Sequence, residues 1–453
     1  MISKLHQLAY TTIVALGLTV SGCGGGDASG GGVALPTPTP SPSPSPSPSP
    51  TPTAGPAASV SFLYTLPEGM PDGAPAAELI KASDGNYYGV MVQGGPNTCR
   101  PESPISCGAI RKVTPSGEES ILYAFGSIPQ DGYTPLMVLQ ASDGALYGVT
   151  TNGGKFGGGG VFFRVTLSGE YKVIYSWGRT EKDGVVPNGI VQGKDGNFYG
   201  TTSSGGEFRC EIIPVSGNNC GTFFKMTPSG QQTVLHSFGS SKVDGYEPLG
   251  TVVEGGDGNF YGITHLGGKF TSNTEGGGGT VFRITPQGAL SIVHDFGETA
   301  NDGLSPNRSL IKGSDGVIYG MTPSGGGGDS CAWQFGCGTI FSVTTAGAFR
   351  QIYAFAKGNF DDGAGPSSIL VSQDGNLYGT AISRGANRCD SCGTVFRLTK
   401  TGVMTTLFSF GPAVVEPSRP TNLVEVRPGV FFGLNEWGGQ KANGSIFFKM
   451  VLN

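Results

Sequence analysis

A few side chains that could do chemistry stand where the sequence breaks its own internal repeat. His265 and Glu436 occupy one repeat position, which elsewhere holds Val92, Thr151, Ser203, Pro323 and Ile382. An imidazole and a carboxylate that face one cavity could act as an acid–base pair. Trp437, which follows Glu436, and Trp333 offer aromatic faces on which a sugar ring could stack. We therefore treat these four residues as candidate binding residues, with drift in variable loops as the alternative.

The other ionisable residues recur from unit to unit, which favours structural roles. Aspartates in Asp-Gly turns form turns first and are candidate calcium ligands second: Asp84, Asp143, Asp195, Asp257, Asp315 and Asp374. We expect a basic column to pair with a turn or with a carboxylate between units: Lys112, Arg164, Lys225, Arg283, Arg397 and Lys449, interrupted by Ser342. His236 and His294 stand at a tyrosine position. The sequence contains no His-Glu-x-x-His or nucleophile-elbow pattern, so we assign no catalytic or metal-binding residue.

All these residues are set into one motif that recurs along the chain. A Tyr-Gly pair returns every 52 to 62 residues, at Tyr88, Tyr147, Tyr199, Tyr261, Tyr319 and Tyr378, with Phe432 as a seventh. Each unit, such as residues 302–355, has four short runs rich in aromatic and β-branched residues. Tight Asp-Gly-Asn and Pro-Ser-Gly turns join the first run to the second and the third to the fourth. In an antiparallel meander the two long connections then lie together, so we expect one loop-rich face that carries binding.

Counting the runs predicts a closed ring. Six units carry all four runs, whereas the seventh stops at its third run, residues 446–451, just before the end of the chain. The missing fourth run occurs at the other end of the chain, at residues 61–66. We therefore predict an all-β fold, a seven-bladed β-propeller of four-stranded antiparallel blades in which this N-terminal strand closes the last blade. Such closure would leave no exposed sheet edge where the chain ends meet.

Eight of the nine cysteines fall in pairs between the second and third runs of their units. The second cysteine of each pair directly precedes the glycine that opens the third run. Equivalent positions in separate units favour four local disulfides, which would stiffen the loop-rich face: Cys99–Cys107, Cys210–Cys220, Cys331–Cys337 and Cys389–Cys392. The last pair also matches a Cys-x-x-Cys redox motif, but no βαβ pattern surrounds it.

The first 57 residues contain an export signal and a tether. Residues 1–22 have the character of a signal peptide, because Lys4 precedes an apolar run that is too short to span a bilayer. The ending Val-Ser-Gly-Cys23 resembles the lipobox of bacterial lipoproteins, which implies that Cys23 becomes the lipidated first residue. Residues 23–57 then form a linker, whose alternating prolines enforce polyproline II. The sorting rule of lipoproteins, with Gly24 after the cysteine, implies the outer membrane or cell surface of the bacterial envelope.

Composition fits one large β-rich domain at residues 58–453 and excludes several other classes. Glycine supplies 79 of the 453 residues, and charged residues make up only 13%. With 37% hydrophobic residues the chain can bury a core, which excludes wholesale disorder. A net charge of -5 without a basic cluster gives no electrostatic footprint for nucleic acid. We expect a monomer that meets the membrane through its lipid anchor.

The repeat resembles a known family. Asp-Gly-Asn-x-Tyr-Gly-x-Thr, Gly-Thr-x-Phe-Arg/Lys-x-Thr-Pro-x-Gly and the Leu-Tyr-Ser-Phe ending are similar to the GloVer tandem repeat of choice-of-anchor extracellular proteins, over about residues 61–453. The resemblance implies an exported, surface-anchored repeat protein and supplies no activity or catalytic residue. We therefore expect a non-catalytic module that binds a glycan, a small molecule or a protein through its loop-rich face. The alternative is an exported propeller enzyme for polysaccharide or lactone substrates, with clustered carboxylates and a metal on that face.

Overall fold

The chain divides into two units, residues 1–53 and 54–453, and the described residues all belong to the second. This computed structural model describes residues 58–65, 79–100, 103–116, 118–210, 220–270, 276–327, 337–356, 360–387, 389, 392–411, 418–437 and 446–452. Side chains at 63–65, 100, 103–105, 436–437 and 446–447 are excepted. Within these residues, no helix is long and apolar enough to cross a membrane.

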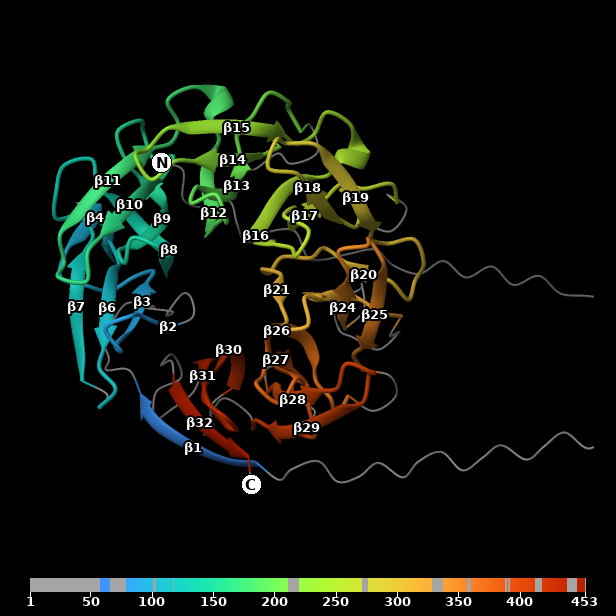
Figure 1. The fold of residues 1–453 in the computed structure, drawn as a ribbon. Helices are drawn as coiled ribbons and strands as arrows, with labels where there is room; N and C mark the ends of the chain where they lie inside the picture. The colour runs from blue at the N-terminus through green and yellow to red at the C-terminus, as the bar shows by residue number, and fades with distance from the viewer. Residues whose placement is uncertain are drawn as a thin grey trace, which may run out of the picture. The chain divides into compact units, whose positions relative to one another are not determined.

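Seven four-stranded antiparallel sheets form the blades of a propeller, as the sequence predicts (Figure 1). In each of blades 1 to 6 the chain begins with an inner strand beside the central axis and proceeds outward through a second, a third and an outer strand. Blade 1 consists of β2 (Ile80–Lys81), β3 (Tyr87–Met91), β6 (Ala109–Val113) and β7 (Glu119–Ala124), and blade 2 of β8 (Gly132–Gln140), β9 (Leu146–Gly153), β10 (Val161–Val165) and β11 (Tyr171–Ser176). Blade 3 consists of β12 (Val185–Gln192), β13 (Phe198–Ser204), β14 (Thr222–Met226) and β15 (Gln232–Ser237). Blade 4 consists of β16 (Tyr246–Glu254), β17 (Phe260–Leu266), β18 (Thr280–Ile284) and β19 (Leu290–Asp295). Blades 5 to 7 are β21 (Ile311–Lys312), β22 (Ile318–Thr322), β24 (Thr339–Val343) and β25 (Phe349–Ala354); β26 (Ala364–Val371), β27 (Leu377–Ser383), β28 (Thr394–Leu398) and β29 (Met404–Ser409); β30 (Ser418–Arg427), β31 (Val430–Trp437), β32 (Ile446–Leu452) and β1 (Ala58–Thr65).

Short elements lie in the connections between these strands. They are β4 (Thr98–Arg100) with β5 (Ser103–Ser106), β20 (Gly303–Leu304) with β23 (Ser324–Gly325), and the single-turn 3-10 helices η1 (Glu181–Asp183) and η2 (Lys242–Asp244). The pair β20 and β23 extends blade 5, whose inner strand is interrupted between residues 305 and 310.

The N-terminal strand closes the ring. β1 pairs antiparallel with β32, from Ala58 opposite Leu452 to Thr65 opposite Ile446. This confirms the predicted closure, although the strand begins three residues earlier than the sequence suggested. Phe62 packs its ring against Phe408 and Phe410, with centroids 6.4 Å apart in both pairs. Both ends of the domain are therefore held in one sheet.

An aromatic contact joins each of blades 1 to 6 to the blade that follows it. The glycine of the Tyr-Gly pair lies opposite a phenylalanine of the third strand, as Gly148 lies opposite Phe163. A Cβ on Gly148 would stand 2.4 Å from the Phe163 ring, so only glycine leaves room for it. Phe163 in turn meets Phe125, which follows the outer strand of blade 1, at 5.3 Å between centroids. Equivalent contacts span the next five joints: Trp177–Phe224, Phe238–Phe282, Phe296–Phe341, Phe355–Phe396 and Phe410–Phe448.

A backbone hydrogen bond accompanies each of these six contacts. The donor is the backbone N–H of the residue that precedes the proline of the inner strand. The acceptor lies in the preceding blade and is the carbonyl of the residue just before the glycine that opens the third strand. Glu247, for example, donates to the Cys220 carbonyl at 2.9 Å. The other pairs are Thr134–Cys107, Val186–Gly159, Ser305–Gly278, Gly365–Cys337 and Arg419–Cys392. All six donors have φ between 53° and 65°, and an X-Pro residue is in any case disfavoured in the right-handed helical region.

The joint between blades 7 and 1 differs from the other six. Arg111 lies opposite Gly89, the register that phenylalanine holds elsewhere. Its guanidinium pairs with Glu119 at 3.3 Å, and its side chain is 11% exposed. Because Glu119 belongs to β7 of the same blade, blade 1 has an internally paired arginine where the other blades have an aromatic residue facing the joint.

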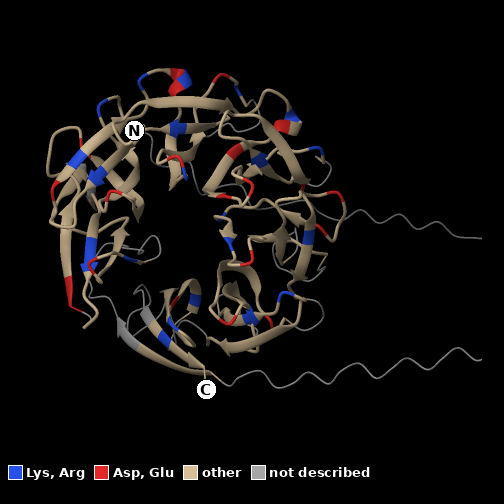
Figure 2. Ribbon diagram, viewed as in Figure 1, with Lys and Arg blue, Asp and Glu red and all other residues tan. Residues whose placement is uncertain are grey.

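The turns and loops lie at two ends of the blades, which we name separately. The short-turn face carries the tight turns, such as residues 141–145 and 166–170 of blade 2. The long-loop face carries the longer connections, such as residues 154–160 and 177–184. Basic and acidic residues are interspersed around the ring (Figure 2).

Candidate functional site

On the short-turn face, the aspartate of each Asp-Gly turn is held by a fixed set of donors. Asp195 accepts hydrogen bonds from the Asn197 backbone at 3.1 Å and from the Tyr199 hydroxyl at 2.9 Å. The Lys225 ammonium adds a third bond at 2.9 Å. The turn and tyrosine bonds recur at Asp84, Asp143, Asp257, Asp315 and Asp374. Among the described residues, no group of three or more His, Cys, Asp or Glu gathers as a metal site would require.

Acid should weaken this network. Burial raises the pKa of Asp195, but hydrogen bonds from Asn197 and Lys225 outweigh it and hold the pKa at about 2, below the ordinary 3.8. Because the folded pKa is depressed, the stability contributed by the carboxylate is present above pH 3.8 and is lost as the pH falls through 2. We expect Asp195→Asn to lower the unfolding free energy by about 1 kcal/mol at pH 7, after allowance for solvent screening. Urea midpoints of variant and wild type should converge near pH 2, and an equal difference at both pH values would contradict the assignment.

Three members of the basic column pair with turn aspartates as predicted, whereas Arg283 donates to Ser291 of its own blade. Lys112, Arg164 and Lys225 each pair with the turn aspartate of their own blade, at 3.7, 3.2 and 2.9 Å. Blade 5 has Ser342 at this position, and Lys400 of blade 6 reaches Asp315 at 2.6 Å instead. The charge that blade 5 lacks is therefore supplied by its neighbour.

A second set of aspartates, which we did not single out from the sequence, lies buried under the long-loop face. Tyr123 and Tyr171 donate their hydroxyls to Asp131 at 2.8 and 2.7 Å. Backbone N–H groups of Gly126 and Gly132 also donate to it, both at 2.8 Å. Burial, together with this carboxylate, raises the pKa of both tyrosines above the ordinary value. Because Tyr171 belongs to blade 2, Asp131 ties two blades together.

An equivalent aspartate occurs at the start of blades 3 to 6, and two of these aspartates are the partners of His236 and His294. His236 Nε2 lies 3.0 Å from Asp244, and His294 Nε2 lies 3.1 Å from Asp302. Tyr175 and Tyr353 make the equivalent bonds to Asp183 and Asp362. The signal was present in the sequence, since each aspartate precedes a glycine and follows its Tyr or His by eight or nine residues.

The structure places His265 and Glu436 apart. His265 is half-buried on β17 of blade 4, where its Nδ1 lies 3.4 Å from the Pro306 carbonyl. The strand register puts it opposite Glu247 of its own blade. Glu436 lies on β31 of blade 7, opposite Arg419, and blades 5 and 6 stand between the two positions (Figure 1).

The remaining predicted residues are described only in part. The side chains of Glu436 and Trp437 lie outside the described part of the molecule, as do Trp333, Cys331 and Cys23. Three predicted disulfides are formed, Cys99–Cys107, Cys210–Cys220 and Cys389–Cys392. Cys337 is disulfide-bonded too. Carbonyls of Cys107, Cys220, Cys337 and Cys392 accept the hydrogen bonds between blades, so the disulfides fix the acceptor side of four joints.

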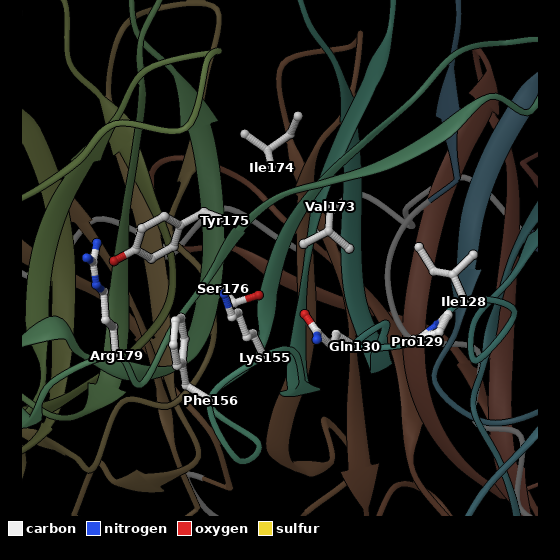
Figure 3. A pocket seen from close by; sticks show the side chains of 10 residues that line it. All are labelled: Ile128, Pro129, Gln130, Lys155, Phe156, Val173, Ile174, Tyr175, Ser176 and Arg179. Carbon is white, nitrogen blue, oxygen red and sulfur yellow. The ribbon is translucent and has the colours of Figure 1, made fainter.

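A pocket of about 640 Å³ opens on the long-loop face at the outer rim of blade 2 (Figure 3). Exposed Phe156 and Ile128 and half-buried Tyr175 give it apolar walls. Lys155 and Arg179 bring two cations into the same pocket. Figure 3 shows Arg179 beside the hydroxyl end of Tyr175, and Lys155 between Phe156 and Gln130. The arrangement can bind a ligand with both an apolar surface and an anionic group.

Family comparison agrees with the repeat analysis. The model of the Gloeobacter/Verrucomicrobia repeat matches residues 53–213 and 271–450. The chain belongs to this repeat family. The predicted GloVer resemblance is thereby confirmed. Residues 214–270, between the two matched segments, include β14 to β17, so in this member of the repeat family blades 3 and 4 are regular there as well.

Solved structures resemble the chain only distantly. A polysaccharide lyase is 10% identical, with a TM-score of 0.47, and covers 86% of this chain and 94% of its own. A protein of unknown function from Dyadobacter fermentans is 12% identical, with a TM-score of 0.43 and coverage of 87% and 99%. A gluconolactonase from Xanthomonas campestris is 11% identical, with a TM-score of 0.34 and coverage of 86% and 100%. A comparison with curated proteins gave no match. These similarities carry no argument about what this repeat protein binds.

Proposed function

We propose that this chain is a binding module of the bacterial cell envelope that holds its ligand on the long-loop face. The observation that carries the proposal is the pocket of blade 2, where Lys155, Phe156 and Arg179 are exposed on a rigid frame. Loops on a rigid scaffold are the usual place for binding residues. On the short-turn face, by contrast, turn aspartates and cations bind one another.

The N-terminal sequence supports an envelope location. Cys23 in its lipobox-like setting would carry the lipid anchor, and the proline-rich linker 23–57 would hold the propeller away from the membrane. The described part of the domain begins with β1 at the outer edge of blade 7. A glycan, a small molecule or a protein could each be bound on the long-loop face by a monomer.

Steric blocking tests which face binds. Thr180→Cys places a single thiol on the long-loop face, and Glu170→Cys places one on the short-turn face, both on exposed residues of blade 2. After coupling to a large polyethylene glycol, the full chain should lose capture of its ligands on a mixed glycan and protein array in the first case and keep it in the second. Equal capture by both conjugates would refute the proposal. Chemical turnover of a captured polysaccharide or lactone would favour the exported enzyme instead.

A further inference from the structure

The blade 2 pocket holds two cations that no carboxylate of the described residues pairs with. Lys155 lies over the Phe156 ring, 5.6 Å from its centroid, and Arg179, which is exposed, lines the same pocket beside Tyr175 (Figure 3). Beneath them, Asp183 is occupied by the Tyr175 hydroxyl and the Arg179 backbone N–H. Both cationic heads are thus held at the surface and are free to meet an anion from solution.

Blade 3 has the equivalent loop, but there the cation is neutralised by a carboxylate of the same blade. The Gly-Gly-Lys155-Phe156 sequence is repeated there as Gly-Gly-Glu207-Phe208. Glu207 pairs with Lys182, which stands at the repeat position of Gln130, at 2.6 Å. Blade 3 therefore neutralises its own cation, whereas blade 2 keeps both charges for a ligand.

We propose that the blade 2 pocket binds an acidic saccharide unit, which deepens the proposed function and rests on it. The C–H face of a pyranose ring would stack on Phe156, which is 39% exposed. Its carboxylate or sulfate would lie between Lys155 and Arg179, where guanidinium geometry favours a two-oxygen contact. The amide of Gln130 and the hydroxyl of Ser176 line the same pocket and suit sugar hydroxyls.

The repeat extends this surface to neighbouring blades, which favours a saccharide chain over an acidic peptide. Phe208 of blade 3 is 36% exposed. Phe270 of blade 4 follows a third Gly-Gly sequence and carries Lys269 at 5.4 Å from its ring. Three consecutive blades therefore present an aromatic ring at one repeat position. A polymer of identical sugar units offers each ring the same face, whereas a peptide has no such repeat.

Titration calorimetry of the full chain at low salt tests this inference. The probes are an oligogalacturonate, a sulfated oligosaccharide, a neutral oligosaccharide of equal length and polyglutamate. We expect one or both acidic saccharides to bind at least about tenfold more tightly than the neutral one, and the better of the two identifies the anionic group. Lys155→Ala, Arg179→Ala and Phe156→Ala should each weaken binding about tenfold or more.

Two further variants give the controls. Lys172→Ala removes an exposed lysine of the same blade outside the pocket and should leave affinity unchanged. Gln130→Lys with Lys155→Glu rebuilds the closed pair of blade 3 and should abolish binding. The inference is overturned if the neutral sugar or polyglutamate binds as well as the acidic saccharides, if no probe binds, or if the pocket variants bind like wild type. Any of these results can coexist with long-loop capture in the steric test, so failure here is distinguishable from failure of the proposed function.

Discussion

Removing residues 58–65 should lower the thermal midpoint of the propeller by on the order of 10 °C or more. The deletion takes away the outer strand of blade 7 and leaves β32 as an unpaired edge. It also strips Phe62 from Phe408 and Phe410. An exposed edge strand invites pairing with another chain, so the variant should aggregate on heating as well. Differential scanning calorimetry and light scattering measure the two effects.

A rescue variant separates the lost strand from a general truncation effect. Ala58 lies opposite Leu452, so the outer strand can be attached after Asn453 through a tight turn like those of blades 1 to 6. Adding Thr-Pro-Ser-Gly and residues 58–65 at the C-terminus of the deletion variant should restore most of the midpoint. An unchanged midpoint after deletion, or no recovery after the addition, would show that β1 does not hold the ring closed.

Gly221→Ala is expected to destabilise the propeller by about 3–5 kcal/mol. Gly221 opens the third strand of blade 3 with a φ of 93°. A Cβ there would stand 2.3 Å from the Thr202 carbonyl oxygen and 2.6 Å from Pro248 of blade 4. The substitution would therefore strain the backbone and push blades 3 and 4 apart at their hydrogen bond. Chemical unfolding followed by tryptophan fluorescence gives the loss.

A matched glycine isolates the packing part of that loss. Gly196, in a tight turn of the same blade, has a φ of 79°, and no heavy atom lies within 4 Å of the place that a Cβ would take. Gly196→Ala should therefore cost only the conformational strain, about 1 kcal/mol. Equal losses for the two variants would mean that the contact with Pro248 contributes nothing to the joint.

The sequence was sufficient for the architecture because each level of the repeat carries its own local signal. Asp-Gly turns, aromatic runs and the Tyr-Gly pair define strands from neighbouring residues alone, and the count of runs placed residues 61–66 in blade 7, where β1 (Ala58–Thr65) lies. The position of the cysteines relative to the glycine that opens the third strand was enough to predict the disulfides Cys99–Cys107 and Cys210–Cys220. These features can be predicted from short stretches of chain or from counting the repeated runs.

Features that depend on the angle between blades were not accessible in this way. The hydrogen bond from Glu247 to Cys220 links residues 27 positions apart across a joint, and nothing local marks a residue before proline as a donor at positive φ. Pairing of Asp131 with Tyr171 of the next blade is likewise set by packing. The pocket was missed because Lys155 and Phe156 occur in a glycine-rich loop whose wall comes from residues 128–130 of another connection. His265 and Glu436 were linked in the sequence by their shared repeat position, and the structure places them on blades 4 and 7.

Arg111 makes the joint between blades 7 and 1 different from the other six. Six joints are closed by ring against ring, whereas at the seventh the place of the third-strand phenylalanine is taken by Arg111, whose charge is paired with Glu119 of its own blade. Local opening of a folded protein begins where the least apolar surface must be separated. The propeller should therefore open first between blades 7 and 1, and amide exchange with solvent would spread from these two blades toward blade 4.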